Sequence, residues 1–183
     1  MVADPDPVVQ ATRTWLERAV IGLNLCPFAR AEYERDRIRF AVSAAVTEGE
    51  LLKDLRRELL ALSQADPARC ETTLLIHPGV LSDFLDYNQF LDRADRLLRQ
   101  CGLEGELQIA SFHPQYQFAG SAGEDVENCT NRSPWPMLHL LREASLTRVL
   151  EAWPGDPAEI VERNLQTMRR LGPDGWRALL AAP

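Results

Sequence analysis

Two of the three histidines in this sequence stand where a strand is expected to end. His77 and His113 each precede a proline, and each follows a short apolar run. The carboxyl ends of parallel strands meet at one edge of a sheet, and ligands of open α/β sheets bind there, so these imidazoles could share a ligand or a metal ion. The alternative is that His-Pro is only a dipeptide that ends a strand. The pattern does not favour either interpretation.

The third histidine, His139, is expected one turn into a helix, with Glu143 four residues later. That spacing puts both side chains on one helix face, as in a metal-binding pair or a histidine oriented by a carboxylate. A surface ion pair is the interpretation that the pattern favours. If the three histidines met, together with Glu143 or Asp125, they would make an adequate site for a divalent metal, either zinc or non-haem iron. The tentative metal ligands are therefore His77, His113, His139 and Glu143.

A thiol offers a different chemistry that needs no metal. Cys26 lies before a proline at an expected helix break. A thiolate there could act as a nucleophile with His77 or His113 as its base. A cysteine between Leu25 and Phe28 is also typical of a small buried hydrophobic residue, and the pattern favours that interpretation. The candidate catalytic residues are therefore His113, His77 and Cys26.

The stretch 113–136 lacks apolar periodicity and is dense in polar and aromatic residues. A connection this long inside a compact domain is usually a functional loop or a disordered one. Arg132 is a candidate clamp for a carboxylate or phosphate, with help from Arg142, and Asn128 and Asn131 are further candidate substrate contacts. An ordinary solvated loop is the alternative, but its three aromatic residues are expected to pack on something.

The elements expected around these residues alternate between strands and helices. Thr47 and Glu50 form a capping-box pattern, Ser82 is expected to cap a later helix, and Gly172 to end another. The order predicts a single α/β domain over 1–183, with a mainly parallel four-stranded sheet, flanking helices and an extra N-terminal helix. Residues 1–5 are expected to be disordered. The expected strands are 37–46, 72–76, 106–112 and 146–153, and helices are expected at 7–23, 29–34, 136–144, 156–171 and 174–180, as well as after Thr47 and after Ser82.

Length and composition set the class of protein. The chain has 183 residues, of which 45% are hydrophobic and 26% charged, as in an ordinary globular domain. Its net charge of -7 gives no overall electrostatic footprint for nucleic acid. No apolar run reaches the roughly 18 residues of a membrane span, and no signal-peptide pattern opens the chain. We therefore expect a cytoplasmic protein that binds neither nucleic acid nor membrane.

Four segments form a distinctive set: 22–29 (GLNLCPFA), 112–118 (FHPQYQF), 130–136 (TNRSPWP) and 139–143 (HLLRE). Together they resemble a family of bacterial proteins catalogued as a domain of unknown function, number 1415. The resemblance covers nearly the whole chain. It implies a bacterial, cytoplasmic, single-domain protein and supports treating the four segments as one functional group. It carries over no catalytic role.

The leading functional hypothesis is an enzyme that acts on a small anionic metabolite at a pocket lined by His and Arg, with a metal in one version. One alternative is a thiol-based enzyme that uses Cys26 without a metal. Another is a metabolite-binding or regulatory module without catalysis. The sequence leaves open whether the protein is an enzyme, and it leaves the oligomeric state open.

Overall fold

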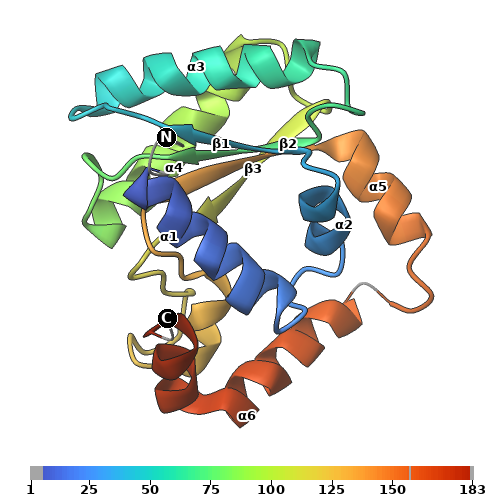
Figure 1. The fold of residues 1–183 in the computed structure, drawn as a ribbon. Coiled ribbons are helices and arrows are strands. Elements are labelled where there is room, and N and C mark those ends of the chain that lie inside the picture. Colours follow the sequence, from blue (N-terminus) through green and yellow to red (C-terminus); the bar gives the residue numbers. More distant parts are fainter. Residues whose placement is uncertain (1–5, 157, 182–183) are drawn as a thin grey trace, which may run out of the picture.

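The computed structural model describes residues 6–156 and 158–181, so the disorder expected for residues 1–5 lies outside the described residues. A sheet lies between two layers of helices (Figure 1). The strands are β1 (Ile38–Val42), β2 (Thr72–Ile76), β3 (Leu107–Phe112) and β4 (Met137–Arg142). The helices are α1 (Pro7–Trp15), the π-helix η1 (Leu16–Ile21), α2 (Ala29–Glu34), α3 (Glu48–Gln64), α4 (Phe84–Gln100), the 3₁₀-helix η2 (Val126–Asn131), α5 (Glu143–Glu151) and α6 (Ala158–Ala181).

The sheet has the order β1-β2-β4-β3, and among the described strands only β1 and β2 pair in parallel. The α/β class and the number of strands are confirmed, but the mainly parallel sheet is wrong. The predicted helix over 136–144 contains strand β4, and the predicted strand over 146–153 lies largely in helix α5. Strand β4 has a partner on each side and little exposure on either face, so its sequence does not alternate, and its Met and Leu residues favour helix when judged alone.

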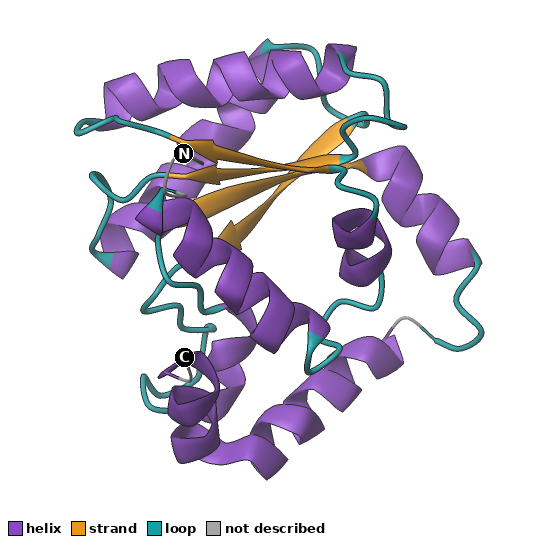
Figure 2. Cartoon of the chain, viewed as in Figure 1, coloured by secondary structure: helices purple, strands orange, loops and turns teal. Residues whose placement is uncertain are grey.

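Strands β1, β2 and β3 nevertheless point in the same direction, because β4 runs antiparallel between β2 and β3 (Figure 2). Met137, the first residue of β4, pairs with Ile76 on one side and Phe112 on the other. The next residues along β2 and β3 are His77 and His113. These two histidines therefore emerge at the same edge of the sheet, with β4 between their strands.

The two faces of the sheet carry separate cores. Helices α3 and α4 cover one face, and α1, η1 and α6 lie on the opposite side (Figure 1). The first core contains Leu51, Leu55, Leu59, Tyr87 and Phe90. The second contains Trp15, Leu74, Met137, Met168 and Trp176. Successive side chains of a strand alternate between these two cores, and that alternation decides which residues can meet.

Local capping accounts for several helix ends. The predicted capping box of α3 is confirmed, because the Glu50 N–H donates to Thr47 Oγ1 at 3.3 Å and Glu50 accepts from the Thr47 N–H at 3.1 Å. Helix α4 begins one residue later than predicted, since Asp83 is its N-cap. Helix α6 is interrupted at Gly172, whose φ of 69° is left-handed, as the Gly-Pro pair predicted. Across the described ranges, no helix has the length and apolar character to cross a membrane.

Candidate functional site

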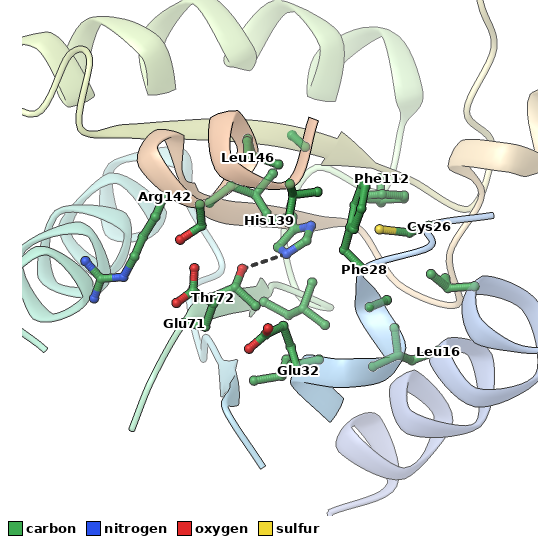
Figure 3. Close-up of a pocket in the computed structure, with 18 of the residues that line it drawn as sticks. Leu16, Cys26, Phe28, Glu32, Glu71, Thr72, Phe112, His139, Arg142 and Leu146 are labelled. Carbon is green, nitrogen blue, oxygen red and sulfur yellow. Dashed lines mark hydrogen bonds between the residues drawn. The ribbon is translucent and has the colours of Figure 1, made fainter. Parts of the chain in front are cut away.

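A cavity of about 280 Å³ opens between the sheet and the helices α1, η1, α2 and α5 (Figure 3). It reaches the edge of the sheet where β1 and β2 begin and β4 ends. A concave, mostly apolar recess with few polar groups is the usual form of a small-molecule site. Its apolar walls are made by Trp15, Leu16, Val20, Phe28, Leu74, Phe112, Leu141, Leu146 and Val149.

The polar centre of this cavity is His139. It lies in strand β4, so its predicted place in a helix is wrong. The Thr72 hydroxyl donates to the Leu140 carbonyl at 2.6 Å and must therefore accept from His139 Nε2, 2.7 Å away. That assigns the proton to Nε2 and leaves Nδ1 as an acceptor on a ring that lines the cavity. Burial lowers the pKa of His139 to about 4, so the imidazole is neutral at pH 7.

Two glutamates bring negative charge to the same cavity, and they differ in their partners. Glu32 of α2 is paired with Arg37, whose Nη2 lies 2.8 Å from one carboxylate oxygen and 2.7 Å from the other. Glu71, directly before β2, has a buried Oε1 that meets no hydrogen-bond partner among the described residues. Figure 3 shows the Glu71 carboxylate beside Thr72 in the cavity lining. The polar end of the cavity is therefore rich in acceptors.

The wall of the cavity opposite the sheet includes the π-helix η1. Leu16 and Val20 of this segment line the cavity. Such π-helical turns are rare and are often found at functional sites. The preceding residue, Trp15, packs its ring edge-on against Phe112, with centroids 5.4 Å apart, and its indole N–H donates to the Arg132 carbonyl at 2.8 Å. The long loop 113–136 therefore contacts this wall of the cavity through Trp15.

Cys26 also lines this cavity, on the segment between η1 and α2 (Figure 3). Helix α6 holds that segment in place, because Asn164 Nδ2 donates to the Leu25 carbonyl at 2.7 Å. The histidine in the same lining is His139, whereas the predicted bases for Cys26 were His77 and His113. Those two lie at the other edge of the sheet, against helix α4.

The structure does bring His77 and His113 together, because both rings lie against Tyr87. Their ring centroids lie 5.9 and 5.0 Å from that of Tyr87. The Tyr87 hydroxyl donates to the Met137 carbonyl at 2.8 Å and accepts from the Phe112 N–H at 3.0 Å. This phenol therefore ties the end of β3 to the start of β4, and burial raises its pKa.

Both of these histidines are fully buried and both hold the turn that follows β2. His77 Nδ1 donates to the Val80 carbonyl at 3.0 Å. His113 Nδ1 accepts from the Gln115 N–H at 3.0 Å, so its Nε2 carries the proton and donates to the Leu81 carbonyl at 3.1 Å. Leu81 has a φ of 60°, a strained conformation for leucine that these contacts stabilise. Burial lowers the pKa of both imidazoles, that of His77 to about 4.

The four tentative metal ligands do not converge. His77 and His113 point toward α4, His139 faces the opposite core, and Glu143 begins helix α5. In the part of the chain that the structure describes, no group of three or more His, Cys, Asp and Glu side chains could hold a metal ion. Asp125, the alternative carboxylate, accepts from the Ala122 N–H at 2.8 Å and so shapes the loop.

The loop asparagines that were candidate substrate contacts bond to the backbone around them. Asn128 is fully buried, accepts from the Phe118 N–H at 3.0 Å, and donates to the Ala122 carbonyl at 2.8 Å. Asn131 donates to the Ser111 carbonyl at 3.1 Å. Both side chains therefore fold the loop onto itself and onto strand β3.

The two candidate arginine clamps are occupied in a similar way. Arg132 Nε donates to the Tyr116 carbonyl at 3.2 Å, and its Nη2 donates to the Gly123 carbonyl. Arg142 borders the cavity, but its guanidinium points away from it in Figure 3. Its Nη2 contacts carbonyls at the end of α3 and just beyond, at 2.6, 2.8 and 3.3 Å; they belong to Leu62, Ala65 and Cys70.

Sequence reasoning missed most of the cavity lining. Glu71 lies directly before β2, and Thr72 is the first residue of this strand, which is buried throughout. Two polar residues at the start of a buried strand were the available signal. Trp15 and Phe28 resembled ordinary core residues. His139 was among the predicted site residues, but it was expected in a helix and lies in strand β4.

Comparison with known proteins places the chain in a family. Residues 7–178 match the family described as "Protein of unknown function (DUF1415)". Searches of curated proteins and of solved structures gave no match. Because the match spans nearly all of the 183 residues, the chain belongs to the DUF1415 family, whose function is unknown.

Proposed function

We propose that this protein binds a small, mainly apolar molecule in the cavity beside His139. The observation that carries the proposal is the 280 Å³ recess itself, which has apolar walls and a neutral imidazole held in one tautomer. A concave apolar recess of this size offers dispersion contacts to a ligand that fits it. A bound apolar molecule would make those contacts.

This proposal corresponds to a metabolite-binding module. The enzyme expected from the sequence, acting on a small anion held by His and Arg, draws less support from the contacts. Arg132 and Arg142 both donate to backbone carbonyls. Glu71 Oε1 has no hydrogen-bond partner among the described residues, and the same is true of Arg142 Nε, although the guanidinium of Arg142 points away from the cavity (Figure 3).

Binding of an uncharged dye tests the proposal. We expect N-phenyl-1-naphthylamine to gain fluorescence when it enters the apolar cavity. Ala110 lines the cavity from β3, so Ala110→Phe should fill it and abolish most of the gain. Ala31→Phe is the matched control, because Ala31 is exposed on α2 and does not line the cavity. Equal fluorescence from the wild type and Ala110→Phe would overturn the proposal.

A thiol-dependent activity is a second candidate, supported by the presence of Cys26 and His139 in one lining. If His139 assists Cys26, alkylation by iodoacetamide should modify Cys26 faster than Cys70 or Cys101, and His139→Gln should slow it. Peptide mass spectrometry gives the rate at each thiol. A Cys26 rate that equals the other two and is unchanged in the variant argues against this activity.

A further inference from the structure

We infer that the ligand of this cavity carries an amine, and that the ammonium group sits against Glu71 while the apolar body lies along the aromatic walls. The inference rests on the proposed function and specifies the class of ligand. It also reverses the sign of charge expected from the sequence, which pointed to an anion.

One carboxylate oxygen of Glu71 is unpaired in the part of the chain that the structure describes. Glu71 lines the cavity, and its buried Oε1 lacks a hydrogen-bond partner among the described residues. Two neighbouring donors bond to other groups: the Thr72 hydroxyl donates to the Leu140 carbonyl, and Arg37 Nη2 is paired with Glu32. A buried carboxylate oxygen without a donor is unfavourable, and a ligand ammonium would form a charge-assisted hydrogen bond to it.

The second observation is that the remaining polar groups are compatible with a cation. The Nε2 proton of His139 points to Thr72, so Nδ1 is left as an acceptor. The neutral imidazole does not repel an ammonium group. The guanidinium of Arg142 points out of the cavity and toward the carbonyls that follow α3.

Other ligand classes fit this polar end less well. A carboxylate or phosphate would face the negative charge of Glu71 without a guanidinium to offset it. An uncharged hydrocarbon would leave Glu71 Oε1 without a donor. An alcohol would donate one hydrogen bond to the carboxylate but would bring no positive charge, so its interaction is weaker than the ion pair formed by an ammonium group.

Three compounds with one phenyl ring and different end groups separate these classes: phenethylamine, 2-phenylethanol and 3-phenylpropanoate. Their affinities are measured at neutral pH by titration followed by NMR of the whole chain. We expect phenethylamine to bind at least about tenfold more tightly than 2-phenylethanol, because its ammonium group pairs with the carboxylate by charge as well as by a hydrogen bond. The carboxylate should bind most weakly.

Substitution of Glu71 tests whether its carboxylate causes the preference for the amine. Glu71→Gln should reduce the advantage of the amine to within about twofold, whereas 2-phenylethanol should still bind, because the Gln amide oxygen also accepts its hydrogen bond, and this binding also shows that the variant is folded. Glu34→Gln is the matched control, because Glu34 is exposed on α2, does not line the cavity and lies 3.8 Å from Arg30. It should leave all three affinities unchanged.

The outcomes distinguish this inference from the proposed function. If the alcohol and the amine bind equally, the inference is overturned while the apolar site stands. If the amine keeps its advantage in Glu71→Gln, the assignment to Glu71 is overturned. If none of the three compounds binds, both the inference and the proposed function are overturned.

Discussion

Each histidine of this protein has one ring nitrogen fixed by a neighbour, and the other nitrogen distinguishes them. In His113 both nitrogens bond to the backbone. In His77 the second nitrogen is buried and meets no partner among the described residues. In His139 the second nitrogen belongs to a ring that lines a cavity. The sequence identified the three residues, but their partners come from the turn 77–82 and from Thr72, which local spacing does not indicate.

The buried neutral histidines predict an acid-sensitive fold. In the unfolded chain each imidazole takes up a proton near its ordinary pKa of 6.5, but burial lowers the pKa of His77 to about 4 in the folded protein. Stability is therefore full above pH 6.5 and is lost as the pH falls toward 4, by roughly 3 kcal/mol for His77 alone. Urea midpoints measured across this range should fall, and those of His77→Asn should fall less steeply. If the urea midpoints of the wild type and of His77→Asn fall equally with pH, burial of a neutral His77 is not the cause of the acid sensitivity.

Tyr87 offers a test of the junction between β3 and β4. Tyr87→Phe leaves the Phe112 N–H and the Met137 carbonyl without this partner, so we expect it to lower the free energy of unfolding by about 1–3 kcal/mol. Tyr33→Phe is the matched control, because its hydroxyl bonds Glu17 at an exposed position, and its effect should stay within about 0.5 kcal/mol. Chemical denaturation measures both. A similar effect at both positions would show that the buried phenol does not tie the strands together.

At the scale of elements, the sequence predicted most of the helices and strands, but it gave strand β4 as a helix and helix α5 as a strand. The strands β1, β2 and β3 and the capped helix α3 were recognised because their local signals agree with their places in the fold. Strand β4 was not recognised, because a central strand shows no alternation and its residues suit a helix equally well. That single exchange also produced the wrong sheet topology and the wrong surroundings for His139.

The loop 113–136 is an ordered element built by its own polar side chains. Because Asn128 bonds to both Phe118 and Ala122, Asn128→Ala should destabilise the protein by about 1–3 kcal/mol and speed amide hydrogen exchange across the loop. Asn88→Ala, at an exposed position on α4, is the control and should do neither. Unchanged exchange in the loop of Asn128→Ala would contradict a structural role for this side chain.

At the scale of the whole molecule, the sheet separates two groups of residues that the sequence had placed in one pocket. His77 and His113 stabilise the carboxyl edge beside α4, whereas Cys26 and His139 line a cavity on the opposite face. The alternation of side chains along β2 and β4 and the register between these strands decide this separation. That register could not be predicted from the sequence, because 136–144 was expected to form a helix. The loop still contributes to the cavity, through the bond from Trp15 to the Arg132 carbonyl.

A ligand that fills the cavity should stabilise the whole fold. At about 100 times its dissociation constant, 2-phenylethanol is expected to raise the free energy of unfolding by about 2.7 kcal/mol, because it binds the folded state alone. Thermal denaturation with and without the alcohol measures this gain. In Ala110→Phe the same alcohol should leave the free energy of unfolding almost unchanged. An equal increase in the wild type and in this variant would show that the alcohol binds outside the cavity.

The most direct test is a crystal structure of the protein grown with 2-phenylethanol. We expect density for the phenyl ring between Phe112 and the π-helix, with the hydroxyl of the alcohol directed to the polar end of the cavity, where His139 and Glu71 lie. A cavity closed by the side chains around it, with no ligand density beside His139, would contradict the claim that this recess is a binding site.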